Sequence, residues 1–260
     1  MGYRVIDTAS SKRFHREKED GNAISRFLAN NENIACREAL FVVSKFATPS
    51  DHEKPLPYEV ADDIPSRILR SVLCSANNLH IDVIDAYFLH TPLRTHTDTL
   101  TAWRALERLV KQGGVRYLGI SNVSYVQLKQ LYNAAEIKPT FVQNWFRKES
   151  QYDGKVMAFC RDNDIVYQIF GLFDKANEEL LQSEPVQRRA QEKSLSLHQA
   201  LLQMLVGGAA HHGLRLGFLD GSTNLQHMRD NLSAVRQKLD DLEIQDLEMF
   251  WQLIGWSKSY

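Results

Sequence analysis

The sequence predicts an α/β fold of the TIM-type (β/α)8 barrel class, and three observations support this. Short apolar runs alternate with longer amphipathic stretches, an order typical of right-handed crossovers in a parallel sheet. The chain has 260 residues, which is a common size for one such barrel. Several apolar runs lead into a polar residue, as strands do at the barrel end where catalytic groups gather. We therefore expect a single barrel domain over residues 1–260.

Short apolar runs are the predicted strands. They are Tyr3–Ile6, Leu40–Ser44, Val83–Leu89, Val115–Ile120, Thr140–Val142, Ile165–Ile169 and Leu214–Leu219. Helical periodicity fills the stretches between them. In "DTLTAWRALERLVKQGG", apolar residues recur at three- and four-residue intervals from Leu100 to Val110, and Gly113-Gly114 end the helix. The polar segment "ATPSDHEKPLPYEVADDIP" follows the second strand, and we expect it to form an active-site loop or lid.

Composition and charge exclude several classes of protein. The 31 basic and 32 acidic residues give a net charge of -1, which argues against general nucleic-acid binding because that needs a basic surplus. No apolar run reaches the roughly 20 residues of a membrane span, and no signal peptide precedes Gly2. Cys36, Cys74 and Cys160 lie far apart, and we expect buried thiols in a reducing compartment. A cytoplasmic protein without nucleic-acid or membrane partners is expected.

Polar residues follow the apolar runs of several predicted strands. Asp7 follows "YRVI", Lys45 follows "FVVS", His90 follows "DAYFL", Ser121-Asn122 follow "RYLGI" and Gln143-Asn144 follow "TFV". An aspartate, a lysine and a histidine that converge on one face form a proton-transfer cluster. Helix capping is the alternative, and it is equally good for Ser121 and Asn122 because both residue types cap helices. It is weaker for Lys45, because a buried lysine needs a partner.

Successive segments of the chain also resemble those of a known family. They are "GYRVIDTA", "LFVVSKF", "DVIDAYFLHTP", "GGVRYLGISNVS", "FVQNWF", "CRDNDIVYQIFGLF" and "GSTNLQHMRDNL". In this order they resemble the motifs of the aldo-keto reductases, and their character is closest to the fungal members. The resemblance implies a (β/α)8 barrel that binds extended NADPH without a glycine-rich Rossmann turn. It also implies hydride transfer to a small-molecule aldehyde or ketone.

The resemblance assigns roles to individual residues. Asp7, Lys45 and His90 fall on three of the family's four catalytic positions. In the family a tyrosine hydroxyl protonates the carbonyl oxygen, the lysine lowers the tyrosine pKa, the aspartate holds the lysine and the histidine orients the carbonyl. The implied cofactor-binding residues are Ser121, Asn122, Gln143, Phe170, Ser222, Thr223, Asn224 and Asn231. Phe170 would lie beneath the nicotinamide, whereas the residues alone favour an ordinary core aromatic.

One family residue is missing from the segment after Asp7, which contains no tyrosine. In the register of fungal members the tyrosine position falls on His15, and in the register of other members it falls on Lys12. An imidazole titrates near neutrality and can donate a proton. A neighbouring Lys45 cation would disfavour the imidazolium, which is the acidic form. An exposed histidine in a basic turn is the alternative, and the sequence slightly favours it.

Family members carry a strand and a helix before the segment that matches "GYR", and here only Met1 precedes it. We therefore expect a barrel that lacks the first βα unit. An alternative start site, a truncated gene model and a divergent paralogue each account for this start. The leading functional hypothesis is NADPH-dependent reduction of an aldehyde or ketone, and the missing tyrosine leaves open whether this activity is intact or impaired. The rival hypothesis is a non-catalytic NADP(H)-binding barrel that acts as a sensor or scaffold.

The phosphate end of the implied cofactor site also departs from the family. Gly221 and His227 stand where the family places basic residues, so we expect a reduced preference for NADPH over NADH. The helix that begins at Ser222–Asn224 is expected to offer free backbone N–H groups.

The remaining polar clusters and the chain's last aromatic residues carry weaker expectations. The sequence shows no third ligand beside His211-His212, so it predicts no metal site. "EKED" and "LDDLEIQDLE" are predicted to be solvated helix faces. We expect Phe250, Trp251, Ile254 and Trp256 to pack in the interior rather than line a substrate pocket.

Overall fold

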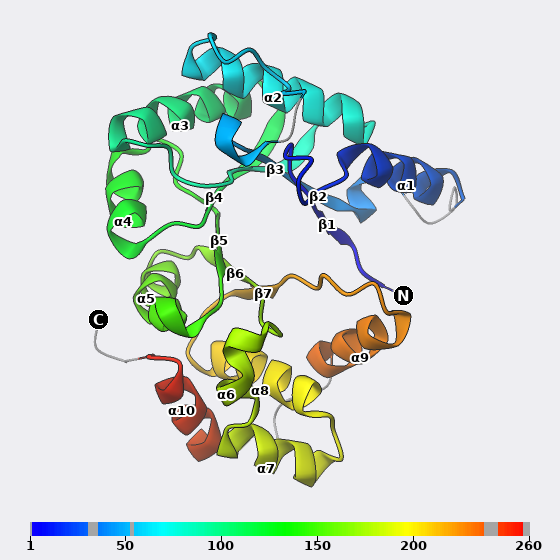
Figure 1. Ribbon diagram of the computed structural model, residues 1–260, viewed down its shortest axis with the longest axis vertical. Coiled ribbons are helices and arrows are strands. Elements are labelled where there is room, and N and C mark those ends of the chain that lie inside the picture. Colours follow the sequence, from blue (N-terminus) through cyan, green and yellow to red (C-terminus); the bar gives the residue numbers. More distant parts are fainter. Residues whose placement is uncertain (1, 31–35, 53–54, 237–243, 257–260) are drawn as a thin grey trace. The chain divides into compact units, whose positions relative to one another are not determined.

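The computed structural model describes residues 2–30, 36–52, 55–236 and 244–256, and the chain divides into two compact units (Figure 1). The N-terminal unit comprises residues 3–141, and the C-terminal unit comprises residues 142–260 with residues 1–2.

Strands and helices alternate throughout the N-terminal unit. Its elements are β1 (Val5–Asp7), α1 (Glu17–Ala29), β2 (Phe41–Phe46), α2 (Ile64–Leu79), β3 (Ile84–Leu89), α3 (His96–Lys111), β4 (Val115–Ser121) and α4 (Tyr125–Ala134). The strands are parallel and neighbour one another in chain order, with Asp7 opposite Val43 and Lys45 opposite Phe88. This register brings the last residues of adjacent strands to one end of the sheet.

Local signals in the sequence account for the boundaries of the helices. Asp63 caps α2 by accepting the Ser66 N–H at 2.8 Å, and Ser124 caps α4 in a reciprocal box with Gln127. Gly113 follows the end of α3 with φ at +79°, a conformation that favours glycine. The predicted loop after β2 is confirmed, because its described residues contain only a 3-10 turn before α2 begins.

The strands of the N-terminal unit are buried, as expected of a parallel sheet covered by helices. All residues of β3 are buried, and Val43, Ala86 and Phe88 form a core cluster. The prediction that "EKED" is a solvated face is wrong for Glu17. That carboxylate is buried and accepts the Ser44 hydroxyl at 2.6 Å, because α1 begins directly over β2.

The C-terminal unit continues the alternation with additional helices. Its elements are β5 (Phe141–Trp145, whose first residue closes the N-terminal unit), α5 (Gly154–Asp162), β6 (Val166–Phe170), α6 (Glu178–Leu181), α7 (Glu184–Lys193), α8 (Leu197–His211), β7 (Leu216–Phe218), α9 (Leu225–Arg236) and α10 (Ile244–Leu253). Strands β5, β6 and β7 are again neighbours in chain order, and β6 pairs with β7 in parallel.

All of the predicted strands are found, with shifted ends. Among the described residues, seven strands follow chain order and each leads to a helix, which is the pattern of a (β/α)8 barrel that lacks one unit. Polar residues were expected at the carboxyl ends of the strands, and they lie there, although the strand bounds are shifted. Asp7, Lys45, Ser121, Gln143 and Asn144 lie inside their strands, within the last residues of each, and only His90 and Asn122 come after them. In a barrel, the polar residues at the carboxyl end of a strand form hydrogen bonds with the neighbouring strand, as its apolar residues do.

Near the C-terminus, the apolar side chains pack as expected, since Phe250, Trp251, Ile254 and Trp256 are all buried. The prediction of a solvated "LDDLEIQDLE" face is wrong for Asp246, which is buried and bonds Arg188 at 2.7 Å; part of that segment lies outside the described residues.

The prediction of three buried thiols holds only for Cys160, because Cys36 is exposed and Cys74 is half-buried. In the described part of the chain, no helix has the length and apolarity to cross a membrane.

Candidate active site

An ion pair between the buried Lys45 and the half-buried Asp7 joins the carboxyl ends of β1 and β2. The Lys45 ammonium donates hydrogen bonds to the Asp7 carboxylate and, at 3.0 Å, to the backbone carbonyl of Thr8. Lys45 is only 1% exposed, and its Nζ also lies 5.9 Å from the centre of the Phe88 ring. A carboxylate, a backbone carbonyl and an aromatic ring therefore replace the water that the ammonium group of Lys45 loses on burial.

Two histidines lie beside this pair. His90 follows β3, and its backbone N–H donates to the Phe46 carbonyl at 2.9 Å, which fixes it next to the end of β2. His15 comes from the turn between β1 and α1, and its ring meets the His90 ring edge to face with centroids 5.8 Å apart. Nδ1 of His90 is buried and has no hydrogen-bond partner within the described residues.

Burial and the Lys45 charge keep both imidazoles neutral. Burial first and the positive charge of Lys45 second lower the pKa of His15 from 6.5 to about 4. The pKa of His90 also falls to about 4, again through burial first and Lys45 second. Near neutral pH the site therefore contains a lysine–aspartate pair and two uncharged imidazoles.

His15 and Lys12, the two residues offered for the position of the missing tyrosine, differ in their surroundings. His15 is half-buried against His90, so the expectation of an exposed histidine in a basic turn is wrong. Lys12, the other candidate for that position, is exposed. The sequence-predicted residues Asp7, Lys45, His90 and His15 thus lie together in the N-terminal unit.

Sequence reasoning missed a second polar group in the same unit. Ser10 donates or accepts a hydrogen bond with His52 at 3.4 Å, and its hydroxyl also receives the Ala47 N–H at 3.4 Å. Burial lowers the pKa of His52. His52 lies in the predicted loop after β2, and its position next to residues that follow β1 supports a role of that loop in shaping the site. No periodic signal in the loop could have revealed this contact.

Ser121 and Asn122 are not helix caps, since Ser124 caps α4. Asn122 has φ at +53°, and its amide donates to the His90 carbonyl at 2.9 Å and to the Ser121 hydroxyl at 3.2 Å. Asn122 therefore holds the loop after β3 against the end of β4. Ser121 is 1% exposed, which leaves little of its hydroxyl for a cofactor in this conformation.

The C-terminal unit contains the other residues assigned to the cofactor. Gln143 donates to Gln168 at 3.0 Å, and the Trp145 ring stacks on Phe170 with centroids 6.2 Å apart and planes at 22°. Phe170 is half-buried, so it is not an ordinary core residue. Side-chain amides and stacked aromatic rings are groups that suit a planar ring with a carboxamide, such as nicotinamide.

A cavity of about 600 Å³ lies in the same unit between the segments that follow β6 and β7. Its lining includes the acidic residues Asp174, Asp220 and Asp230 and the histidines His198 and His227. No lysine or arginine is among the described lining residues. The cavity is large enough for a nucleotide portion of a cofactor, but its charge opposes phosphate groups.

The expectation of free N–H groups at the start of α9 is wrong in part. The Asp220 carboxylate accepts the Ser222 N–H at 3.0 Å. The Asn224 side chain caps the helix by accepting the N–H groups of Gln226 at 2.8 Å and His227 at 3.3 Å. A phosphate at this helix start would compete with groups of the chain itself. Asn231 is also engaged, because its amide donates to Asp220 at 3.2 Å.

Comparison with known proteins gives a consistent result. Residues 1–219 match the model of the Aldo/keto reductase family. Glycerol 2-dehydrogenase (NADP(+)) of Hypocrea jecorina is 29% identical over 273 residues, which covers 94% of this chain and 78% of that protein. Glyoxal reductase of Bacillus subtilis is 29% identical over 203 residues, with 78% of this chain and 64% of that protein covered.

Solved structures resemble the fold over almost the whole chain. An aldo/keto reductase from Brucella melitensis has a TM-score of 0.75 at 22% identity and covers 97% of this chain and 85% of its own. A Bombyx mori aldo-keto reductase in complex with NADP has a TM-score of 0.75 at 22% identity, with 96% of this chain and 78% of its own covered. At these identities the likeness concerns the fold alone.

We predict that Asp7→Ala destabilises the protein strongly. Removal of one partner of a buried pair commonly costs about 3–5 kcal/mol, because the other charge is left uncompensated. The measurement is the thermal midpoint and the urea midpoint of the variant. Glu136→Ala is the matched control, since it breaks the Lys111–Glu136 pair, whose side chains are 54% and 68% exposed. Equal midpoints for the two variants would show that Lys45 does not depend on Asp7.

We predict that Asp220→Asn tightens NADPH binding by about tenfold, which corresponds to about 1.4 kcal/mol. The amide preserves the shape of the side chain but removes a negative charge from the cavity. The gain should be smaller for NADH, which lacks the 2′-phosphate. Fluorescence titration gives both dissociation constants. Asp164→Asn, which removes an exposed carboxylate paired with Arg215, is the control. A lack of change in Asp220→Asn would place the phosphates elsewhere.

Proposed function

This chain belongs to the aldo/keto reductase family, and on that premise we propose that it reduces an aldehyde or ketone to an alcohol with NADPH as the cofactor. The observation that carries the proposal is the buried Lys45–Asp7 pair with His90 and His15 beside it. Burial of a lysine costs free energy because the ammonium loses its water. Apolar residues would pack at this position at least as well as the ion pair does. We therefore assign a catalytic role to the cluster of Asp7, Lys45, His90 and His15.

The chain's own residues divide the work on the carbonyl. The neutral His90 imidazole donates an N–H to the carbonyl oxygen and orients it. His15 supplies the proton that the oxygen takes up as the alcohol forms, from the position that a tyrosine holds in the family. The Lys45 charge stabilises the negative charge that develops on the oxygen, and Asp7 keeps the ammonium in place.

The cofactor would supply the hydride, and the chain's residues would hold it. Gln143 and the stacked pair of Trp145 and Phe170 suit the nicotinamide end. The cavity lined by Asp220 is large enough for the adenosine phosphate end of the cofactor, but its acidic residues repel the phosphate groups. NADPH binding is accordingly weaker here than in relatives with a basic residue at that position. The relatives named as a glycerol 2-dehydrogenase and a glyoxal reductase support a small-molecule carbonyl as the substrate class.

A second function is favoured by one observation, the neutral state of His15. With its pKa near 4, only about one His15 in a thousand carries the acidic proton at pH 7. A protein that binds NADP(H) as a sensor or scaffold needs no proton donor. The two functions separate in one experiment, which combines fluorescence titration of NADPH with its oxidation in the presence of 4-nitrobenzaldehyde. Binding with turnover supports the reductase, and binding without turnover supports the sensor.

We predict that the reductase rate rises as the pH falls from 8 to 5. His15 acts as an acid only when it is protonated. Above its pKa of about 4, the protonated fraction increases about tenfold for each unit by which the pH is lowered. The measurement is kcat for aldehyde reduction across this range, with circular dichroism at each pH to verify that the fold is intact. A rate that is independent of pH would indicate that the proton does not come from His15.

Two substitutions at the same position complete this test. His15→Tyr places a phenol beside Lys45 and should raise kcat at pH 7 by about a hundredfold, the lower range for general acid catalysis. His15→Phe has nearly the same shape as His15→Tyr without the hydroxyl, and it should be inactive. NADPH binding should be equal in both variants, because the cofactor residues are unchanged. Equal rates in the two variants would contradict a catalytic position for residue 15.

A further inference from the structure

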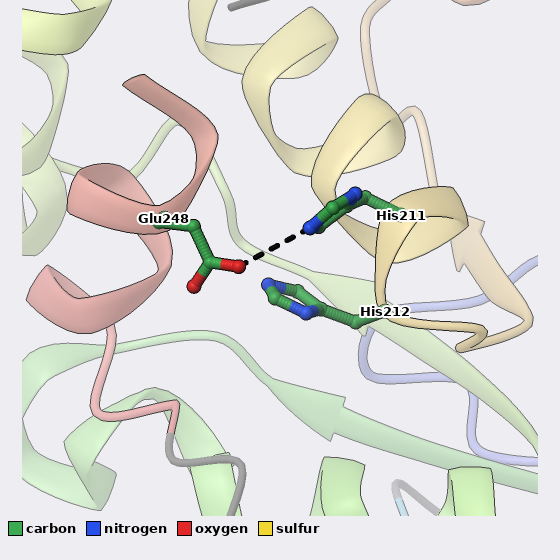
Figure 2. Close-up of side chains that lie close together, drawn as sticks. All are labelled: His211, His212 and Glu248. Atoms are coloured by element: carbon green, nitrogen blue, oxygen red, sulfur yellow. Dashed lines mark hydrogen bonds and ion pairs between the residues drawn. The ribbon is translucent and has the colours of Figure 1, made fainter. Parts of the chain in front are cut away.

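A cluster of potential metal ligands lies in the C-terminal unit, away from the cavity described above. His211 is the last residue of α8, His212 caps that helix, and Glu248 lies on α10. Nε2 of His211 lies 3.2 Å from Oε1 of Glu248, and one ligand atom from each of the three residues lies within 4.8 Å of the others. Figure 2 shows the two imidazole rings and the carboxylate directed toward one another. The prediction of no metal site rested on the lack of a third ligand, and that premise is wrong.

The packing of α10 against α8 holds this arrangement in place. The His212 ring packs against both Trp251 and Trp256, with ring centroids 4.9 and 5.0 Å away. The Trp251 indole donates to the Met204 carbonyl at 3.1 Å, which fixes α10 on α8. At Gly208 a Cβ would lie 1.7 Å from the Trp251 nitrogen, so only glycine permits this approach. The register of the two helices is therefore set by buried groups that are not ligands.

The chemistry of the three side chains suits a zinc ion. Two imidazoles and a carboxylate are common ligands of Zn²⁺, at about 2.0–2.2 Å from the metal. Tetrahedral ligands at that distance are about 3.4 Å apart, which the His211–Glu248 separation already matches. The three ligand atoms lie within 4.8 Å of one another, so binding of the ion would require side-chain rotations that bring His212 to the same spacing. The end of α8 also favours a cation, because the carbonyl groups there carry the negative end of the helix dipole.

We propose that His211, His212 and Glu248 bind one Zn²⁺ ion, and that the ion fastens α10 to the end of α8. The His211 and Glu248 side chains are 31% and 24% exposed, which gives the ion a route from solvent and leaves its fourth position to water. The ion would neutralise the carboxylate and connect two helices that are far apart in the sequence. The ion would therefore hold α10 to the end of α8, in addition to the contacts that Trp251 makes with α8.

The direct test is calorimetric titration of ZnCl₂ into chelator-treated protein that carries Cys36→Ser, which removes the exposed thiol as a competing ligand. One ion per chain is expected. His211→Ala and Glu248→Gln should each weaken binding by at least about tenfold, since even outer-shell changes around zinc cost that much. His198→Ala removes an exposed histidine from the start of the same helix and should bind zinc like the parent protein.

A second measurement tests the link between the helices. Zinc that binds the folded state should raise the thermal midpoint of the parent protein, and the rise should be absent in Glu248→Gln. Hydrogen exchange in α10 should slow on addition of zinc. Two results would overturn the proposal: no binding at millimolar zinc, or binding that neither ligand variant weakens. Binding without protection of α10 would overturn the proposed link between the helices.

Discussion

The burial of Lys45 is the constraint on which the candidate active site depends. A lysine that loses nearly all of its water needs an anion at contact distance, and the parallel register of β1 and β2 places Asp7 there. His15, in the segment after β1, and His90, directly after β3, lie beside this pair, and the Lys45 charge lowers the pKa of both imidazoles. The positions of the site residues thus follow from one charge and from the register of the strands that flank it.

The burial and the Lys45 charge that lower the pKa of both histidines also make acid catalysis incompatible with full stability of the fold. Both histidines are neutral in the folded protein down to a pH of about 4, whereas in the unfolded chain they take up protons below about 6.5. Between these values the unfolded state binds more protons, so the fold loses stability as the pH decreases. The conditions that protonate His15 are therefore those that weaken the fold. A phenol avoids this conflict because it is uncharged in its acidic form, which explains why an imidazole is a poor substitute beside Lys45.

The sequence predicts those features that depend on periodicity and on strand ends, and it fails where contacts join distant segments. Alternating apolar runs were enough to locate the strands, and the polar residue at each strand end located Lys45 and His90. The burial of Glu17 could not be predicted, because its partner Ser44 belongs to another element. The third ligand Glu248 was hidden in an acidic helical segment that reads as solvated. The hydrogen bond that Asp220 accepts from the Ser222 N–H could not be predicted either, because it depends on the geometry of the turn before α9.

The most direct test of this account is the titration of the His15 and His90 imidazoles by NMR, with Lys45→Met as the comparison. The account predicts that both rings titrate near pH 4 in the parent protein, and that both pKa values rise when the lysine charge is removed. Burial is the larger cause, so the values should remain below 6.5 in the variant. A ring that titrates near 6.5 in the parent protein would contradict the account, because His15 or His90 would then lie in water and outside the field of the Lys45–Asp7 pair.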